Sequence, residues 1–585
     1  MNAKRNVAGF VLLILSLLAA CRKDDGTDGT DSGSTTSYTL NSNYTVASVL
    51  AENTATHEDA SDYAWDAASE VQITLNGTSI TTSNASLVTI EGSKATITDG
   101  GNYRISGTLT NGEIKVETAG TAAPVRLILN GAHITNATSS AIYVANASKT
   151  IVVLVEGTQN TLADGASYVY ENPAEEEPNA TLFSGDALTI TGSGALSVDA
   201  HFADAITSKD GLILAGGTVT VDAKDDGIRG KDYLIVRGSA VQVTAAGDGL
   251  KSDNDSDATL GYVLLDDADV VVTAGADAVQ GATDVLVSGG TFELTTNTGN
   301  DTAKGLKAGK HLVVDGGDFH FNTADDALHS NNNLCVNAGT FQISSKDDGI
   351  HADTSLIING GDITITKSYE GIESRAIAIR GGIIRLTASD DGLNAAGGND
   401  GSAQSNFPGA TSSNRGFFIL VTGGYTVVNA TGDGVDANGG IEMTGGTLLV
   451  NGPTAQNNAA LDYDASFKIT GGLLLAAGSS GMAQAPGTSS SQYSVLASFG
   501  TTVSAGTIAH VEAADGTTIF TFKPSKNYQT LVFSAPELKS GATYKLYTGG
   551  SSTGTATDGL YSGGAYTAGT LKSEFTLGSV VTRVQ

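Results

Sequence analysis

The sequence predicts an all-β solenoid, and three observations support this fold class. A unit of 22 residues recurs, in which a glycine is followed nine positions later by an acid: Gly317 and Asp326, Gly339 and Asp348, Gly361 and Glu370. Apolar and polar residues alternate on both sides of the glycine, which indicates strands. The chain has 74 glycines and only 8 prolines, so corners are frequent and backbone donors stay free for pairing. One lap with three short strands is one coil of a parallel β-helix, with about 22 residues per coil.

Residues 1–21 have the features of an export signal. Lys4 and Arg5 precede an apolar run, Val7 to Leu18, that is short for a membrane span. Leu18-Ala-Ala-Cys21 resembles a bacterial lipobox, which implies a lipid on Cys21; an ordinary signal peptide is the alternative. Arg22-Lys-Asp-Asp resembles the charged tag of surface-exposed lipoproteins in some Gram-negative bacteria. We therefore expect an exported protein, lipid-anchored to the outer membrane and exposed at the cell surface.

Composition divides the rest of the chain into four segments. Residues 22–65 are rich in Gly, Ser, Thr, Asp and Asn and predict a flexible tether. Residues 66–183 predict irregular first coils and an N-terminal cap, and 184–490 the regular parallel β-helix. Residues 491–585 predict a small antiparallel β-cap over the open end. If Cys21 carries lipid, Cys335 has no disulfide partner, and its apolar column with Val313 and Ile357 predicts packing.

The balance of charge restricts the partners. The formal net charge is −31, with 62 acids against 31 bases. Such a chain repels nucleic acid and anionic membrane surfaces and attracts cations. We expect no nucleic-acid partner, membrane contact through Cys21 only, and a monomer.

One acid per coil forms a column. Coils stack about 4.8 Å apart, and two carboxylates at that distance repel by roughly 3.5 kcal/mol at an effective dielectric near 20. The acids must protonate, pair with bases or bind a cation, and many oxygen ligands suit Ca²⁺. The alternative is that Asp-Asp-Gly only forms turns. The column contains Asp204, Asp226, Asp248, Asp277, Lys304, Asp326, Asp348, Glu370, Asp391, Asp433 and Asn458.

Three groups in and beside this column are candidate Ca²⁺ sites, because acid doublets place two carboxylates at one corner. The first group is Asp390, Asp391, Asn394, Asp433 and Asp436, the second Asp225, Asp226 and Asp248, and the third Asp347 and Asp348.

Lys304 stands where the column should have an acid. As a charge clamp it neutralises its neighbours; as a general base it would have to lose a proton that flanking acids hold. We favour the clamp and expect no catalytic residue, but Lys304 or Lys224 would be the base of a lyase. The candidates for sugar contact are Lys304, Lys307, His329, His351, Tyr369 and Glu373, and those for ring stacking are Tyr262, Tyr369, Phe407 and Tyr425, since Trp65 lies outside the repeat.

His329 and His351 occupy the same position in successive coils. Stacked imidazoles can bind a transition metal. A ladder that contacts sugar or solvent is the alternative that we favour.

Several motifs resemble a known family: Lys224-Asp-Asp-Gly-Ile-Arg-Gly-Lys, Gly247-Asp-Gly-Leu-Lys-Ser-Asp, Lys304-Gly-Leu-Lys-Ala-Gly, Lys367-Ser-Tyr-Glu-Gly-Ile-Glu, Asp390-Asp-Gly-Leu-Asn-Ala-Ala-Gly-Gly-Asn-Asp-Gly and Gly478-Ser-Ser-Gly-Met-Ala-Gln. The chain resembles secreted bacterial carbohydrate-binding parallel β-helix proteins, a family similar to the calcium-dependent family-nine pectate lyases. The resemblance implies a right-handed β-helix, several Ca²⁺ ions and binding of plant-type polysaccharide, cellulose or acidic sugars.

The lyase motif is incomplete in this chain. The related lyases hold calcium with an Asp-Asp pair and a further Asp three residues on. Here Arg229 follows Asp226 at that distance, and His351 follows Asp348. Asp433 and Asp436 keep the spacing, but Gly432 replaces the first acid of the doublet. We therefore expect a calcium-dependent surface lipoprotein that binds an acidic glycan such as polygalacturonate, or cellulose. The alternatives are a pectate-type lyase that acts by β-elimination and a structural or adhesive surface protein.

Overall fold

The computed structural model describes residues 39–120, 123–170, 174, 176–297, 299–396 and 416–585. Regular structure in these residues is almost entirely strand, with one short α-helix, α1 (Val46–Leu50), and the 3₁₀ turns η1 (Ala60–Tyr63) and η2 (Ala67–Ser69). No helix among them is long and apolar enough to cross a membrane. The all-β prediction is thus confirmed.

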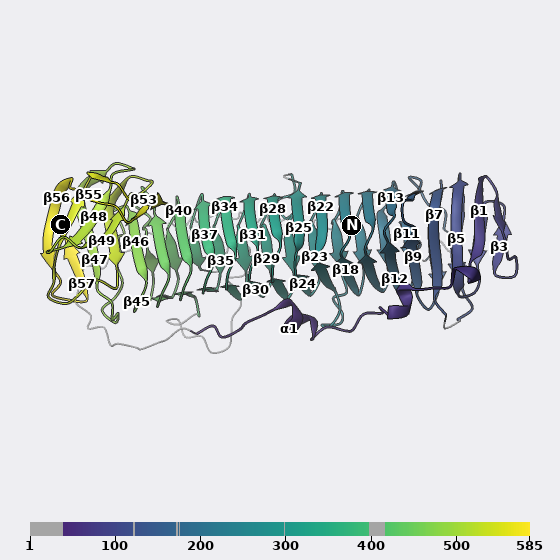
Figure 1. The fold of residues 1–585 in the computed structure, drawn as a ribbon, viewed down its shortest axis with the longest axis horizontal. Coiled ribbons are helices and arrows are strands. Elements are labelled where there is room, and N and C mark those ends of the chain that lie inside the picture. Colours follow the sequence, from purple (N-terminus) through teal and green to yellow (C-terminus); the bar gives the residue numbers. More distant parts are fainter. Residues whose placement is uncertain (1–38, 121–122, 171–173, 175, 298, 397–415) are drawn as a thin grey trace, which may run out of the picture. The chain divides into compact units, whose positions relative to one another are not determined.

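Successive laps of the chain stack in parallel. From β10 (Gln159–Ala163) to β43 (Thr447–Asn451), strands pair with the strand three further along the chain. Leu306 pairs with Leu328, Leu328 with Ile350, and Ile350 with Ile372, a constant step of 22 residues. Figure 1 shows the laps side by side in chain order. The pairing is consistent with a β-helix-like solenoid.

Each lap contributes one short strand to a sheet that we call the short-strand sheet. It contains β3 (Val88–Glu91), β4 (Lys94–Ile97), β6 (Glu113–Glu117), β8 (Ile142–Asn146), β11 (Ala180–Ser184), β14 (Asp204–Ser208), β17 (Ile228–Gly230), β20 (Leu250–Ser252), β23 (Val279–Gly281), β26 (Leu306–Ala308), β29 (Leu328–Ser330), β32 (Ile350–Ala352), β35 (Ile372–Ser374), β38 (Leu393–Ala395), β41 (Val435–Ala437) and β44 (Asp462–Tyr463).

The other two strands of each lap belong to the large sheet. One row within it is β15 (Gly211–Ala215), β18 (Tyr233–Arg237), β21 (Tyr262–Asp266), β24 (Asp284–Val287), β27 (His311–Val314), β30 (Asn333–Val336), β33 (Ser355–Ile358), β36 (Ala376–Ile379) and β39 (Phe418–Val421). The other row is β16 (Thr218–Ala223), β19 (Ala240–Ala245), β22 (Ala268–Ala274), β25 (Gly290–Thr296), β28 (Asp318–Thr323), β31 (Thr340–Ser345), β34 (Asp362–Lys367), β37 (Ile383–Ala388) and β40 (Tyr425–Ala430).

The core lies inside the stacked laps. Residues alternate between the inside and the surface; β28, for example, buries Phe319 and Phe321 between exposed neighbours. Phe319 stacks on Phe292 and Phe341 of the adjacent laps at centroid distances of 4.6 and 4.7 Å. Equivalent residues pack on one another because the repeat places them one strand spacing apart.

Residues 39–65 are ordered against the body, which corrects the tether prediction for that stretch. Val46 and Val49 of α1 pack on outward-facing apolar residues of the β15 to β39 row. Asp315 accepts a hydrogen bond from the backbone N–H of Val46 at 3.0 Å, and Asn337 donates to the Tyr44 carbonyl at 2.8 Å. The segment is held because it covers an apolar column that would otherwise face water.

Cys335 belongs to this covered column. It is fully buried and pairs in register with Val313 and Ile357. The packing prediction for this thiol is confirmed.

Both ends of the stack carry antiparallel strands. At the start, β1 (Val71–Gly77) pairs with β2 (Ile80–Thr82), and β3 with β4. At the other end, β46 (Leu473–Gly478) pairs antiparallel with β50 (Tyr528–Ser534), which also pairs with β47 (Ser494–Val503). A further sheet contains β48 (Ala509–Ala513), β49 (Thr518–Phe522), β51 (Thr543–Thr548), β53 (Thr555–Thr557), β54 (Leu560–Ser562) and β56 (Thr570–Thr576). Of these strands, β50 occupies the pairing edge of the last lap.

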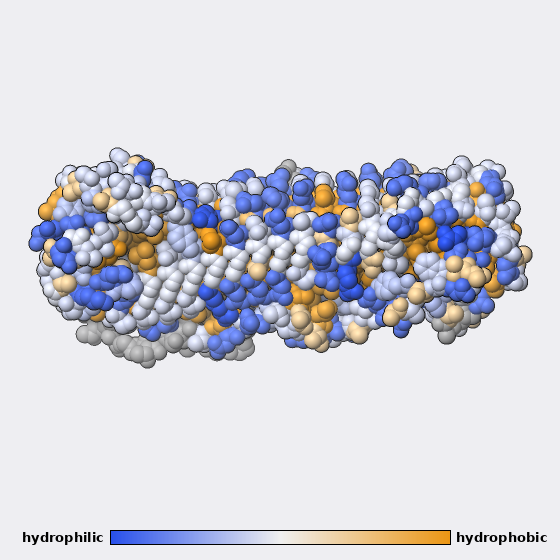
Figure 2. All heavy atoms as spheres, viewed as in Figure 1, coloured by the Kyte–Doolittle hydropathy of each residue, from blue (hydrophilic) through white to orange (hydrophobic). Residues whose placement is uncertain are grey.

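The surface of the laps is mainly polar. Figure 2 shows hydrophilic residues spread over most of the viewed face, with apolar residues in separate patches. Exposed polar positions alternate with buried apolar ones along the long strands, such as β16 and β19.

Candidate functional site

The acid column is a hydrogen-bonded ladder beside the short-strand sheet. One carboxylate oxygen of an acid accepts the backbone N–H of the equivalent residue in the next lap; the Asp248 N–H donates to Asp226 at 2.9 Å, and the Asp348 N–H to Asp326 at 2.9 Å. The same contact joins Asp204 to Asp226, Asp248 to Asp277, Asp277 to Lys304, Asp348 to Glu370, Asp391 to Asp433, and Asp433 to Ala459. The predicted alignment of Asp326, Asp348 and Glu370 is confirmed, whereas Ala459 takes the place expected for Asn458.

A second row of side chains, the outer ladder, lies three residues after the column. It runs in register through Thr207, Arg229, Lys251, Gln280, Lys307, His329, His351, Glu373, Asn394, Asp436 and Asp462. Bases dominate this ladder up to His351, and oxygen-bearing groups follow from Glu373 onward. The ladder therefore neutralises one half of the acid column and leaves the other half without bases.

In the basic half, ammonium groups pair with the column. Lys251 Nζ lies 2.7 Å from Asp248 and 2.9 Å from Asp226, and Lys307 Nζ lies 3.0 Å from Asp277. Burial disfavours the charge of Lys251, but Asp248 and Asp226 raise the pKa of its ammonium above the ordinary value. The group predicted as a second Ca²⁺ site, Asp225, Asp226 and Asp248, is thus neutralised by a lysine at two of its three carboxylates.

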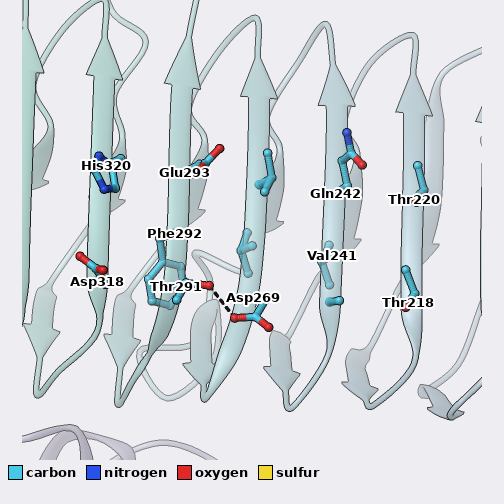
Figure 3. Close-up of a pocket in the computed structure, with 13 residues that line it drawn as sticks. Thr218, Thr220, Val241, Gln242, Asp269, Thr291, Phe292, Glu293, Asp318 and His320 are labelled. Carbon is cyan, nitrogen blue, oxygen red and sulfur yellow. Dashed lines mark hydrogen bonds between the residues drawn. The ribbon is translucent and has the colours of Figure 1, made fainter.

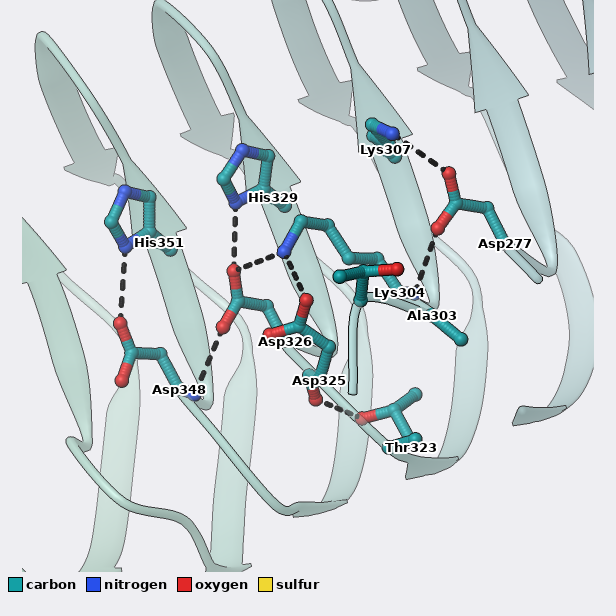
Figure 4. Close-up of polar contacts among 12 residues, drawn as sticks. Asp277, Ala303, Lys304, Lys307, Thr323, Asp325, Asp326, His329, Asp348 and His351 are labelled. Atoms are coloured by element: carbon teal, nitrogen blue, oxygen red, sulfur yellow. Dashed lines mark hydrogen bonds and ion pairs between the residues drawn. The ribbon is translucent and has the colours of Figure 1, made fainter. Parts of the chain in front are cut away.

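Lys304 is held between the two carboxylates of one doublet. Its Nζ lies 2.6 Å from Asp325 and 3.3 Å from Asp326 (Figure 4). Burial disfavours the charge, but Asp326 and Asp325 raise the pKa of Lys304 above its ordinary value. The ammonium is charged at neutral pH, as a charge clamp requires. Lys224, the other candidate base, lies exposed in the turn before Asp225.

His329 and His351 form a buried stack. Their ring centroids lie 4.8 Å apart with an interplanar angle of 13°. His329 Nδ1 lies 2.7 Å from Asp326, and His351 Nδ1 lies 3.0 Å from Asp348 and 3.2 Å from Glu373. Burial opposes the charge, but these carboxylates and Asp353 raise the pKa of His351 well above its ordinary value.

The two rings are thus buried rather than solvated, contrary to the open ladder that the sequence favoured. Two groups of metal-ligating atoms include them: Asp326 with His329 and His351, and Asp348 with His351 and Glu373. In the second group the proton that His351 keeps on its ring competes with a metal for the nitrogen.

The acidic half contains a cluster of oxygens that we call the oxygen cluster: Asp391, Asp433 and Asp436. One oxygen from each lies within 4.8 Å of the others. Burial, and then the neighbouring acids, raise the pKa of Asp391 and Asp436 to about 7 and that of Asp433 to about 6. The cluster thus carries repulsion that the ion pairs relieve in the basic half.

Asn394 and Glu373 continue this cluster toward the histidines. Asn394 donates its amide N–H to Glu370 at 2.5 Å, while its Oδ1 is buried without a hydrogen-bond partner among the described residues. Glu373 Oε1 is buried and unpartnered in the same way. An oxygen-only set with buried, unsatisfied acceptors fits a hard cation such as Ca²⁺. The structure therefore brings four of the five residues of the first predicted site together.

The fifth residue, Asp390, lies at the rim of the same region. A hydrogen bond from Tyr369 to Asp390 raises the pKa of the Tyr369 hydroxyl to about 12. Asp462, which follows Asp436 on the outer ladder, was missed because a longer loop shifts its spacing to 26 residues. The third predicted pair is split: Asp347 lies with Asp325 and Asp326, and Asp348 with His351.

A hollow of about 640 Å³, here called the groove, lies over this ladder from Asp248 to Glu373. Lys304, Lys307, His329 and His351 line it, and Tyr369, 39% exposed, lines it with Glu370 and Glu373. The groove thus contains every residue that the sequence proposed for sugar contact.

The other aromatic candidates do not face the groove. Tyr262 is fully buried, and its hydroxyl donates to the Thr54 carbonyl, so it cannot stack on a sugar. Tyr425 is half-buried beside Arg385 and donates to the Thr557 carbonyl. Phe407, like Cys21, lies outside the described residues.

Comparisons with known proteins agree with a carbohydrate site. A family model described as "Carbohydrate-binding domain-containing protein" matches residues 91–349 and 346–566. A protein of the same description from Acetivibrio thermocellus is 34% identical over 152 residues, which are 26% of this chain and 53% of that protein. The chain thus spans about half the length of this relative.

A solved structure, titled as the polysaccharide lyase-like protein from C. thermocellum in a gadolinium derivative, is also similar. It is 29% identical with a TM-score of 0.37, and the match covers 39% of this chain and 91% of that one. Because the family matches extend over most of the sequence, this chain belongs to the family of carbohydrate-binding domain-containing proteins.

Proposed function

We propose that this protein binds an acidic polysaccharide in the groove, with Ca²⁺ held at the oxygen cluster. One observation carries the proposal: a row of basic side chains that line the groove continues directly into an oxygen-only cluster on the same ladder. A glycan with carboxylate groups can meet the ammonium of Lys307 and, further along, a bound cation.

The charged lysines support binding of carboxylates. The Lys307 side chain is 31% exposed, and its ammonium pairs with a single acid of the column. A uronate carboxylate can add to such a pair without leaving a buried charge unpaired. Lys304 is more deeply held, because its ammonium pairs with both Asp325 and Asp326.

The oxygen cluster has the chemistry that Ca²⁺ prefers. Asp391, Asp433 and Asp436 would hold the ion, with Asn394 Oδ1 as a neutral ligand. The ion would neutralise the cluster and attract the glycan's carboxylate. Because the pKa values of these acids are raised to between about 6 and 7, metal binding at neutral pH releases protons.

The same electrostatics favour binding over cleavage. β-Elimination needs a base that is neutral before it removes the proton next to the carboxylate. Lys304 is kept charged by Asp325 and Asp326. We therefore propose retention of the glycan without cleavage, and the lyase is the alternative that the assay below detects.

The test is affinity electrophoresis of the full chain in gels with polygalacturonate, with calcium and with chelator. Retardation should need calcium and should weaken in Lys307→Ala, while Lys572→Ala, an exposed lysine of the C-terminal sheet, should behave as the unmodified protein. Retardation that is equal with chelator refutes the calcium role. Growth of ultraviolet absorbance from an unsaturated uronate, abolished by Lys304→Ala, establishes the lyase. No retardation under either condition favours an adhesive protein.

The finer architecture and location are part of the proposal. We propose that the laps wind as a right-handed parallel β-helix, that the protein is a monomer, and that Cys21 anchors it at the cell surface. The location is supported by the sequence of residues 1–25. Metabolic labelling with a fatty acid tests the anchor: the label should disappear in Cys21→Ala, and a label that persists refutes it.

A further inference from the structure

The large sheet carries a second hollow, on strands other than those of the groove. It measures about 450 Å³ and lies on the outward side of β16, β19, β22, β25 and β28 (Figure 3). We call it the sheet hollow. Its strands β25 and β28 follow β23 and β26, which line the groove, so the two hollows overlap along the stack.

The side chains of the sheet hollow stand in rows across the strands. Gln242, Val271, Glu293 and His320 are register partners on four successive strands. A second row beside it contains Ala240, Asp269, Thr291 and Asp318. Neighbouring positions in a row are about 4.8 Å apart, which is close to the length of one sugar unit in an extended β-linked chain.

The chemistry of these rows differs from that of the groove. Among the described residues that line the hollow there is no lysine or arginine, while Asp269, Glu293 and Asp318 are exposed carboxylates. With no lysine or arginine beside them in this described lining, these carboxylates repel an acidic sugar but accept hydrogen bonds from neutral hydroxyls. Gln242 and His320 add donors, so the rows can satisfy both the donor and the acceptor sides of a hydroxyl.

An apolar surface lies between these polar groups. Val271 is 40% exposed in the middle of the first row, although most valines of this sheet are buried. Ala240 adds apolar surface in the neighbouring row. Pyranose rings present C–H faces that gain free energy on apolar surface, and hydroxyl edges that need polar partners. The exposed aliphatic side chains of the sheet hollow can contact the C–H faces, and the carboxylates and the amide beside them can bond to the hydroxyl edges.

From this hollow we infer that the protein has a second glycan site, which takes a neutral polysaccharide chain laid across β16 to β28. Its hydroxyls bond to Gln242, Asp269, Glu293 and His320, and a sugar ring packs on Val271. The inference goes beyond the acidic-glycan groove and does not depend on it. Together the two sites would let one protein hold two different glycans at once.

The experiment is calorimetric titration of the full chain with cellohexaose, xylohexaose and mannohexaose. We expect binding of at least one of them, weakened about tenfold or more in Glu293→Ala and in Val271→Asp. Because both side chains point outward, neither change should disturb the core. A thermal unfolding temperature equal to that of the unmodified protein is the control that each variant folds. Gln342→Ala, on the next strand of the same row but outside the hollow, is the matched control and should change affinity less than about twofold.

The outcome separates this site from the groove. Lys307→Ala should leave the neutral sugar's affinity unchanged, and Glu293→Ala should leave polygalacturonate retardation unchanged. The inference is overturned if none of the three hexasaccharides binds, or if binding survives both Glu293→Ala and Val271→Asp. It is also overturned if Lys307→Ala removes the binding, because the neutral sugar then occupies the groove.

Discussion

The change Asp391→Asn tests whether the oxygen cluster is a cation site. Asparagine keeps the oxygen that accepts the Asp433 N–H, so the hydrogen-bonded ladder survives while one charge is removed. Without calcium the charge of Asp391 costs stability, because burial and the neighbouring acids raise its pKa from 3.8 to about 7. That rise corresponds to about 4 kcal/mol, and solvent screening of this partly exposed group reduces it to about 1–2 kcal/mol.

The sign of the effect follows from the direction of the shift. A carboxyl whose pKa is raised on folding stabilises the fold below its unfolded value, near 3.8, and that contribution is lost as the pH rises to about 7. In chelator, Asp391→Asn should therefore unfold at the same urea concentration as the unmodified protein near pH 4. It should be more stable by about 1–2 kcal/mol at pH 8.

Calcium should reverse this order. A ligand that binds only the folded state stabilises it by about 2.7 kcal/mol at a hundredfold excess over its Kd. The unmodified protein should gain such an increment at pH 8, and Asp391→Asn should lose most of it. The measurement is urea unfolding at several pH values with calcium and with chelator, and Asp222→Asn, an exposed acid of β16, is the control. Equal calcium responses in Asp391→Asn and the unmodified protein would refute the site.

Three further predictions concern the scaffold. Lys251→Met should lower the free energy of unfolding in urea by about 3 kcal/mol, because Asp226 and Asp248 lose their shared cation. Adding Asp248→Asn should recover part of this loss, and a double variant with no recovery would contradict the ion-pair account. Phe319→Ala should cost about 3–5 kcal/mol by opening a cavity in the aromatic stack, while Phe319→Leu costs less; equal costs would show that volume does not matter there. Burial raises the pKa of Cys335 to about 11, so the native thiol should resist a thiol reagent at pH 8 that labels it in urea; rapid native labelling would show that residues 39–53 leave the column open.

The sequence determined the lap and its register. Each lap meets the same position of the next, so a 22-residue period suffices to align Asp326, Asp348 and Glu370, to stack the phenylalanines and to bury Cys335. It also identified Asp391, Asn394, Asp433 and Asp436 as one group, because equal offsets from the column acids Asp391 and Asp433 place Asn394 beside Asp436 on the outer ladder. Local spacing is enough wherever the contact is between neighbouring laps.

Only the tertiary structure decided which charges are paired. Lys251 lies three residues after its own acid and lies within 2.9 Å of both that acid and the one before it. Arg229 at the equivalent position pairs with Asp253 at 2.6 Å and approaches Asp204 of the column only to 3.8 Å. Side-chain direction, which spacing does not give, makes that difference. On the outer ladder, the side chains change from bases to oxygen-bearing groups after His351, and the sequence lists these residues. It does not show that the bases form ion pairs with the column while the oxygen cluster stays unpaired.

The segment 39–65 shows the same limit over a longer distance. Its composition is typical of a tether, but Val46 reaches Asp315, 269 residues along the chain, and α1 covers apolar side chains that point away from the core. A strand's outward residues are expected to be polar, and these are not, because another part of the chain excludes water from them. Sequence periodicity predicts contacts between repeats; it contains no signal for a non-repeating segment that binds their surface, and only the folded chain provides that contact.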